Sequence, residues 1–182
     1  GTHMVYILLA DGIEEIEALA VADILRRASV DTQLVSVSGK DTVCGAHNIT
    51  VGADVAISDV KSDFDMVILP GGYPGYVNLQ KSAEVKKIVE FAVENSKYVA
   101  AICAAPSVLG SWGVLKNKKA VCYPSFEDKL TGAQVGYDDV ACDGNIITSR
   151  GAGTAHKFAF KIVELLKDAE TADKIKSAMI YQ

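Results

Sequence analysis

Residues 98–109, Tyr-Val-Ala-Ala-Ile-Cys-Ala-Ala-Pro-Ser-Val-Leu, join an apolar run to a helical segment and place Cys103 at the junction. The apolar run over 98–103 is typical of a buried β-strand. Pro106 is typical of the first turn of a helix, so we expect a helix to start within 105–110. A buried strand that passes directly into a helix is a building unit of α/β sheets.

The same alternation continues on both sides of this unit. Further apolar runs predict strands at 5–10, 33–37, 65–69, 120–123, 140–142 and 146–148. Helical spacing of apolar residues predicts helices at 14–28, 83–94, 154–166 and 173–179. Turn residues between Gly39 and Ala53 predict a small β-hairpin, and 54–64 is expected to be only a connection. Apolar strands alternating with helices indicate a mostly parallel α/β sheet with helices on both faces.

Composition and charge narrow the function classes. The 182 residues are 49% hydrophobic and 23% charged, which predicts one globular domain. We expect it to comprise 4–182, because Gly1-Thr2-His3 resembles the remnant of a cleaved expression tag. The net charge of -5, without a Lys/Arg block, argues against a nucleic-acid partner and against electrostatic membrane attachment. No apolar stretch approaches transmembrane length.

The cysteines indicate a reducing environment and no metal site. Cys44, Cys103, Cys122 and Cys142 are widely spaced and form no CxxC pair. This pattern is typical of reduced thiols in a cytoplasmic protein, and neither a disulfide framework nor a zinc site is expected. The first strand is not followed by G-x-G-x-x-G, so no nucleotide cofactor is expected either.

Four turns follow predicted strands. They are Asp11-Gly12 to Glu17, Pro70-Gly71-Gly72, Cys103-Ala104 and Ser149-Arg150-Gly151. In doubly wound sheets, ligands bind beyond the carboxyl ends of the strands. If the sheet is parallel, these turns converge, and the sequence predicts a site where they meet.

Cys103 is the candidate nucleophile of that site. A position at a strand end and a helix N-terminus favours the thiolate, which is the reactive form of cysteine. Ala101 and Ala105 provide small neighbours, as in a nucleophile elbow. The alternative is a buried cysteine that serves as a small hydrophobe.

Glu17 is the candidate acid or base. It adjoins Ala18, Leu19 and Ala20, and a carboxyl group desolvated there would have a raised pKa and stay protonated. It would then donate a hydrogen bond to a thiolate or act as a general acid/base. Glu14 and Glu15 are expected to be solvated acids of the first helical turn.

The remaining candidates have supporting roles. Gly71 and Gly72 either end a strand or let backbone N–H groups approach an oxyanion. Arg150 is expected to form a structural ion pair with Asp23, the alternative being a free surface residue. Tyr123 closes a strand near the predicted site, although tyrosine is a poor base at neutral pH.

Four segments resemble the ThiJ/PfpI superfamily, and within it the Parkinson-disease protein deglycase branch. The segments are LADGIEEIE at 9–17, LPGG at 69–72, AAICAAP at 100–106 and TSRGAGT at 148–154. They occur in the family order and span nearly all of the chain from Met4 onward. The resemblance implies a flavodoxin-like three-layer sandwich and a homodimer.

The resemblance also implies roles for individual residues. Cys103 would be the nucleophile and an easily oxidised thiol, and Glu17 its protonated hydrogen-bond partner. Gly72 and Ala104 would supply backbone N–H groups to an oxyanion. The histidines that relatives carry near the cysteine are replaced by Tyr123 and Ala104, so a peptidase-type Cys-His dyad is not expected. His47 stands where some relatives have an arginine, and it would affect anion binding near a dimer interface.

These observations favour the hypothesis that the protein is an enzyme. It would act on reactive dicarbonyls such as methylglyoxal, or on glycated side chains, without glutathione. A first alternative is a non-enzymatic sensor of oxidative stress in which Cys103 is oxidised. A second is a chaperone in which the cysteine is incidental.

Overall fold

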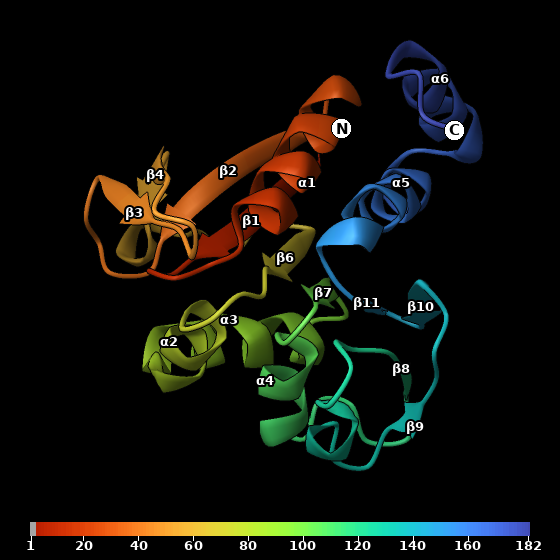
Figure 1. Cartoon of the computed structure of the whole chain (residues 1–182). Coiled ribbons are helices and arrows are strands. Elements are labelled where there is room, and N and C mark those ends of the chain that lie inside the picture. The colour runs from red at the N-terminus through yellow and green to blue at the C-terminus, as the bar shows by residue number, and fades with distance from the viewer. Residues whose placement is uncertain (1–2) are drawn as a thin grey trace.

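The fold is built on a seven-stranded sheet in the order β10-β11-β7-β6-β1-β2-β5, seen in a computed structural model that describes residues 3–182 (Figure 1). Its strands are β1 (Met4–Leu9), β2 (Asp31–Ser36), β5 (Val55–Ala56), β6 (Met66–Leu69), β7 (Tyr98–Ile102), β10 (Val140–Asp143) and β11 (Ile146–Ser149). Only the β10–β11 pair is antiparallel among these neighbours. The prediction of a mostly parallel sheet is confirmed.

Helices cover both faces of this sheet. One face carries α1 (Glu15–Arg27) and α5 (Ala155–Leu166), with α6 (Ala169–Ala178) packed beside α5 (Figure 1). The other face carries α2 (Gly75–Lys81), α3 (Ala83–Glu94) and α4 (Pro106–Ser111). The predicted three-layer sandwich is therefore confirmed. Among residues 3–182, no helix is long and apolar enough to cross a bilayer.

Smaller elements lie around the sheet. The predicted hairpin is formed by β3 (Thr42–Cys44) and β4 (Thr50–Gly52), which pair antiparallel. A second small sheet pairs β8 (Lys119–Ala120) with β9 (Gln134–Val135). Three single 3₁₀ turns complete the described chain, namely η1 (Ile57–Asp59), η2 (Glu127–Lys129) and η3 (Ala152–Thr154).

Three local predictions differ from the structure. The segment 54–64 holds β5 and η1, because Asp54 donates its backbone N–H to Leu34 and so starts a strand beside β2. Helix α2 was not predicted, since its seven residues are too few to show an apolar period. The strand predicted at 120–123 ends at Ala120, beyond which the backbone turns toward Cys103.

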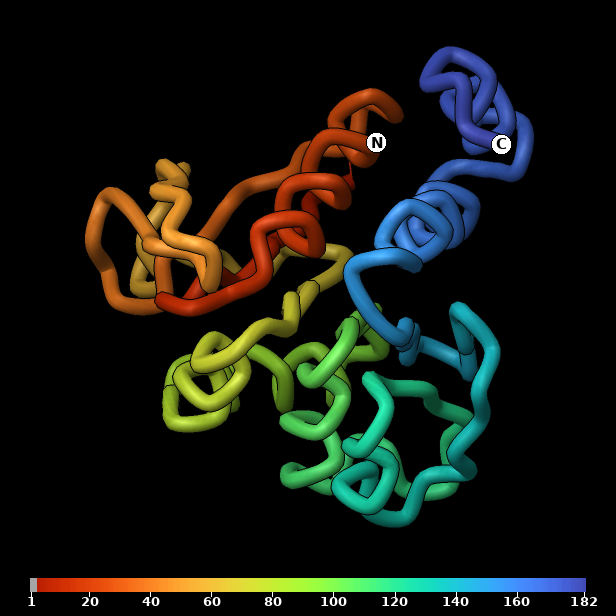
Figure 2. Tube along the Cα trace, in the orientation of Figure 1, coloured from red at the N-terminus to blue at the C-terminus, as the bar shows by residue number. Residues whose placement is uncertain are grey.

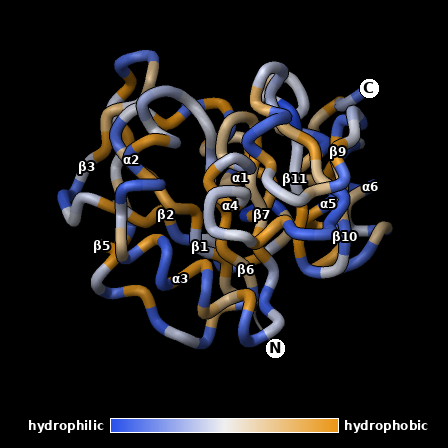
Figure 3. Tube along the Cα trace, turned by 90° about the horizontal axis from the view of Figure 1, so that it is seen from below, coloured by the Kyte–Doolittle hydropathy of each residue, from blue (hydrophilic) through white to orange (hydrophobic). Residues whose placement is uncertain are grey.

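The core lies between the sheet and its helices. All four residues of β6 are buried, and so are Val99 to Ile102 in β7. The apolar segments gather along the central strands, and the polar ones follow the peripheral loops (Figure 3). Strands with two buried faces need continuous apolar runs, which is why the sequence reveals them clearly.

The parallel register brings several strand ends to one edge of the sheet. Leu69 of β6 lies opposite Ala101 of β7, and Ser149 of β11 lies opposite Ile102. The chain therefore leaves β6, β7 and β11 on the same edge, and these exits can be followed in the tube of Figure 2. Cys103 is the first residue beyond β7 at this edge.

Candidate active site

Cys103 occupies a constrained turn between β7 and α4. Its backbone N–H donates to the Ser149 carbonyl at 3.0 Å, and its own carbonyl accepts from the Tyr123 N–H at 2.8 Å. Its φ is +67°, a left-handed conformation that is uncommon for a residue with a side chain. Such strain persists where the surrounding structure enforces it, often at functional sites. The half-buried side chain thus sits in a turn like the predicted nucleophile elbow.

Glu17 reaches this turn from the first turns of α1. Its side chain is buried, with 1% of the residue exposed. Its Oε1 accepts the Gly71 N–H at 2.9 Å. Its Oε2 is buried and has no hydrogen-bond partner of good geometry among residues 3–182. An unpaired buried carboxylate oxygen is costly, and a proton on that oxygen would reduce the cost.

Two glycines bring Cys103 and Glu17 together. A Cβ on Gly71 would lie 2.7 Å from the Cβ of Cys103 and 2.8 Å from the Oε1 of Glu17. A side chain at position 71 would therefore push the two groups apart. Gly72 has a φ of +92°, which glycine adopts without strain. Together with the bond from the Cys103 N–H to the Ser149 carbonyl of β11, these contacts bring the ends of β6, β7 and β11 and the start of α1 together.

The pKa of Glu17 is raised to about 7 from its usual 4.5. Burial is the main cause, and the charge of Glu14 adds to it, while hydrogen bonds with Cys103 and the Gly71 N–H oppose it. The predicted direction is therefore confirmed. Near neutral pH, the group exists in both protonation states, as a proton carrier requires.

The pKa of Cys103 is raised to about 12, so the prediction that this turn favours the thiolate is wrong for the net direction. Burial is the largest cause, followed by the charge of ionised Glu17 and its hydrogen bond to the thiol. The backbone N–H groups of Ala104 and Gly72 do lower the pKa, as expected of donors aimed at the sulfur, but they are outweighed. Cys103 thus rests as a thiol that is hydrogen-bonded to Glu17.

The supporting residues are only partly where the sequence placed them. Tyr123 does lie beside Cys103, through its backbone N–H. The predicted Arg150–Asp23 ion pair is wrong. Asp23 pairs with Arg27 at 2.6 Å, one turn further along α1, and the Arg150 Nε donates to the Cys122 carbonyl at 3.5 Å. A partner four residues away on the same helix lies within reach, whereas Arg150 belongs to a distant segment.

His47 and Glu15 form a contact that the sequence did not predict. The His47 Nδ1 lies 3.0 Å from Glu15 Oε1, and the His47 backbone N–H donates to Glu15 Oε2 at 2.8 Å. Glu15 is buried and Glu14 is half-buried, so the expectation of two solvated acids is wrong. The Glu15 carboxylate accepts the backbone N–H groups of His47 and Ile49 in the hairpin, whereas Glu14 Oε2 accepts the Ile16 N–H and caps α1.

These contacts shift both pKa values. Burial would raise the pKa of Glu15, but hydrogen bonds from its own backbone, from His47 and from Ile49 lower it overall. The hydrogen bond to Glu15, with the charges of Glu14 and Glu15, raises the pKa of His47. Glu14, Glu15 and His47 are the one group of potential metal ligands that comes together within 3–182, and Glu15 already accepts hydrogen bonds from the hairpin backbone.

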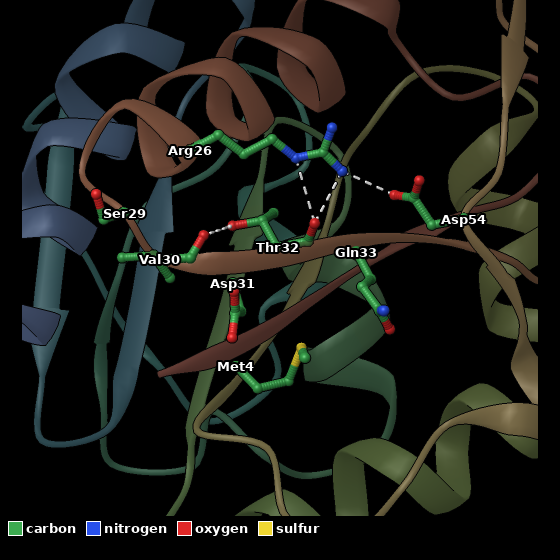
Figure 4. A pocket seen from close by; sticks show the side chains of 8 residues that line it. All are labelled: Met4, Arg26, Ser29, Val30, Asp31, Thr32, Gln33 and Asp54. Atoms are coloured by element: carbon green, nitrogen blue, oxygen red, sulfur yellow. Dashed lines mark hydrogen bonds and ion pairs between the residues drawn. The ribbon is translucent and has the colours of Figure 1, made fainter. Parts of the chain in front are cut away.

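A separate hollow of about 660 Å³ lies at the opposite edge of the sheet (Figure 4). It is lined by Met4, Arg26, Ser29, Val30, Asp31, Thr32, Gln33 and Asp54. The Arg26 guanidinium donates to the Thr32 carbonyl and to Asp54 Oδ2, both at 2.8 Å. These bonds cover the part of β2 that β5 does not reach. The hollow thus lies where Arg26 protects backbone groups of β2 that have no neighbouring strand.

Comparison with known proteins gives consistent matches. The model of the DJ-1/PfpI family matches residues 3–165. The chain is 38% and 39% identical to DJ-1 homologs B and A of Arabidopsis thaliana, but spans only 42% and 47% of their lengths. It is 33% identical to glutathione-independent glyoxalase DJR-1.2 of Caenorhabditis elegans, covering 93% of this chain and 91% of that one. It is 34% identical to deglycase PYRAB04690 of Pyrococcus abyssi, covering 90% and 99%.

Solved structures agree with the sequence matches. The crystal structure of Drosophila melanogaster DJ-1beta superposes with a TM-score of 0.96 at 34% identity and covers 100% of both chains. The structure of oxidized Toxoplasma gondii DJ-1 gives a TM-score of 0.95 at 35% identity, with 99% of each chain covered.

Proposed function

The chain belongs to the DJ-1/PfpI family, and from this premise we propose that it is a cysteine-dependent enzyme acting on reactive dicarbonyls such as methylglyoxal, or on early glycation adducts. The observation that carries the proposal is the convergence of the Cys103 sulfur, the Glu17 carboxyl group and the N–H groups of Gly72 and Ala104 at one turn. Relatives named glyoxalase and deglycase support the same chemistry. The family resemblance identified from the motifs is confirmed.

In the first step, Glu17 takes the proton of the Cys103 thiol as the sulfur attacks the aldehyde carbon of methylglyoxal. A C–S bond forms, the carbonyl π bond opens, and the oxygen becomes an oxyanion. The N–H groups of Gly72 and Ala104 would stabilise that oxyanion. Its protonation by Glu17 gives a hemithioacetal and returns Glu17 to the carboxylate.

In the second step, Glu17 removes the proton from the former aldehyde carbon and delivers it to the neighbouring carbon, through an enediol. The product is a lactoyl thioester of Cys103. Water then cleaves the C–S bond, which releases lactate and regenerates the thiol. A carboxyl group with a pKa near 7 suits both directions of proton transfer.

Lactate formation from methylglyoxal without glutathione tests this proposal. We expect the purified chain to form one lactate for each methylglyoxal consumed, as measured with an enzymatic lactate assay. Glutathione should not increase the rate, because Cys103 supplies the thiol. If no lactate forms at any of the pH values tested from 6 to 9, the proposal is contradicted.

A second function, sensing of oxidants through Cys103, is favoured by one observation. The donors that would hold an oxyanion, Gly72 and Ala104, would equally hold a cysteine sulfinate, and a related structure is described as oxidized. Mass spectrometry after mild peroxide treatment, combined with the lactate assay on the same protein, separates the two functions. Selective gain of two oxygens at Cys103 with negligible dicarbonyl turnover would support the sensor.

We further propose that the protein acts as a cytoplasmic homodimer. Three exposed apolar side chains, Ile16, Leu19 and Ile49, border one groove of about 480 Å³ along α1. An apolar groove of this kind is typical of a surface covered by a partner. His47 lies two residues from Ile49 and would contribute at the rim of that interface. Four free cysteines suit a reducing compartment.

Light scattering tests the dimer. We expect a mass of twice the 19.3 kDa chain at micromolar concentration. Ile16→Asp should shift the mass toward the monomer, because it would bury a charge in the interface. Val93→Asp is the matched control, since Val93 is similarly exposed but lies on α3, across the sheet. A monomeric wild type would contradict the proposal.

A further inference from the structure

Four aromatic side chains form a continuous row that the proposed reaction does not use. Ring centroids are separated by 6.2 Å between Tyr73 and Tyr76, by 5.3 Å between Tyr76 and Phe126, and by 6.4 Å between Phe126 and Tyr123. The row, called here the aromatic row, joins the loop after β6 to the loop after β8. These distances are typical of favourable aromatic contacts.

Both ends of the aromatic row are fixed to the surroundings of the candidate nucleophile. Tyr73 directly follows Gly72, whose N–H is aimed at the Cys103 sulfur. Tyr123 donates its backbone N–H to the Cys103 carbonyl at 2.8 Å. In addition, the Tyr76 N–H donates to the Gly72 carbonyl at 2.9 Å. The row thus begins and ends at residues that touch Cys103 or its oxyanion donors.

The two end rings are available to a ligand. Tyr73 is 73% exposed and Tyr123 is 48% exposed, whereas Tyr76 and Phe126 are half-buried and hold the row together. Exposed aromatic rings carried by residues next to a nucleophile's backbone partners offer flat apolar surface with little conformational freedom to lose. The catalytic turn itself, with Ala104 and Ala105, has no side chain large enough to select a substituent.

The charge on the row argues against a cationic ligand. The Lys129 ammonium lies 4.7 Å from the centroid of the Phe126 ring and already occupies one aromatic face. A guanidinium or ammonium group bound along the row would meet this like charge. A neutral planar group would not.

We propose that the aromatic row makes the site selective for 2-oxoaldehydes whose second carbonyl carries a flat apolar substituent, so that an arylglyoxal is preferred to methylglyoxal. The turnover of arylglyoxals rests on the proposed function, whereas the binding of a flat substituent by the aromatic row does not. Tyr73 and Tyr123 are the specificity-determining residues, because their rings would stack on the substituent while the aldehyde meets Cys103.

Steady-state kinetics with phenylglyoxal and methylglyoxal form the first test. Selectivity is the ratio of the two kcat/KM values. We expect Tyr73→Leu to lower this ratio about fivefold, the size of one aromatic contact. Tyr73→Phe should keep it within about twofold because the ring remains. Tyr123→Leu should lower the ratio similarly, and Tyr137→Leu is the matched control, an exposed tyrosine outside the row.

Alkylation of Cys103 forms a second test that needs no turnover. The probes are 2-bromoacetophenone and bromoacetone, and each forms a C–S bond with Cys103 as its C–Br bond breaks and bromide leaves. Rates are read from the Cys103 peptide by mass spectrometry and compared with the reactivity of glutathione toward both probes. The measured quantity is the rate with 2-bromoacetophenone divided by the rate with bromoacetone. We expect this ratio to be larger for Cys103 of the wild type than for glutathione, and to fall toward the glutathione value in Tyr73→Leu.

The two tests separate the inference from the proposed function. Aryl selectivity in labelling that is lost in Tyr73→Leu, without turnover of either dicarbonyl, would support the aromatic row and contradict the enzyme. Turnover of both dicarbonyls, with a labelling ratio equal to that of glutathione and a kinetic ratio unchanged in Tyr73→Leu, would overturn the aromatic row and leave the enzyme standing.

Discussion

Cys103→Ser is expected to lower kcat/KM for methylglyoxal by a factor of at least about 10³, the scale of removing a nucleophile. A hydroxyl group holds its proton far more tightly than a thiol, so Glu17 could not activate it. The substitution changes one atom, and serine tolerates the turn as well as cysteine does. Measurement of initial lactate release against substrate concentration gives the comparison directly.

Cys142→Ser is the matched control for that experiment. Cys142 is exposed, belongs to β10 and lies away from the turn, so its variant should retain the wild-type rate. Circular dichroism of both variants should match the wild type, because neither substitution empties a large core volume. Lactate release by Cys103→Ser at the full rate would rule out the cysteine mechanism.

Glu17→Gln is expected to lower kcat/KM by about 10²- to 10⁴-fold, the usual contribution of a general acid/base. The amide preserves the acceptor for the Gly71 N–H but carries no transferable proton. A bell-shaped pH profile of kcat/KM in the wild type, with its acidic limb near the raised pKa of Glu17, should lose that limb in the variant.

The same variant is expected to change the pH dependence of stability. Glu17 ionises at about 7 in the folded chain but at 4.5 as an unperturbed group. The folded state therefore binds more protons between these values, and stability falls as pH rises through the window. The lost stability is roughly 3 kcal/mol above pH 7, because each pKa unit corresponds to about 1.4 kcal/mol. Glutamine cannot ionise and escapes this loss.

Urea unfolding at pH 4.5 and pH 8 measures this effect. The free energy of unfolding of Glu17→Gln, relative to wild type, should be higher at pH 8 than at pH 4.5 by roughly 3 kcal/mol. Glu90→Gln, at an exposed position of α3, should show little such change. An equal difference at both pH values would mean that folding does not raise the pKa of Glu17, and the proton-carrier role would fail with it.

The sequence located the reactive residues better than it described their state. It placed Cys103 and Glu17 on turns that do converge, because strand ends in a parallel sheet share an edge. It did not give the direction of the Cys103 pKa, since burial and the Glu17 charge come from other segments. Hydrogen bonds from the helix N-terminus, which are local, were anticipated.

Contacts between distant segments show the same limit. The Asp23–Arg27 pair, the burial of Glu15 under the hairpin and the role of 54–64 as part of the sheet each depend on which segments pack together. Helix α2 is held by its neighbours and not by a period of its own.

The amino-acid sequence by itself determined the layered α/β architecture, the positions of its main strands along the chain and the identity of the cysteine turn. These features depend on apolar runs, on helical spacing and on residues that favour turns, all of which are local along the chain. Only the tertiary structure decided which charges pair, which acids are buried and whether the Cys103 thiol keeps its proton. Each of those energies depends on distance and burial, and folding sets both by joining residues that are far apart in the sequence.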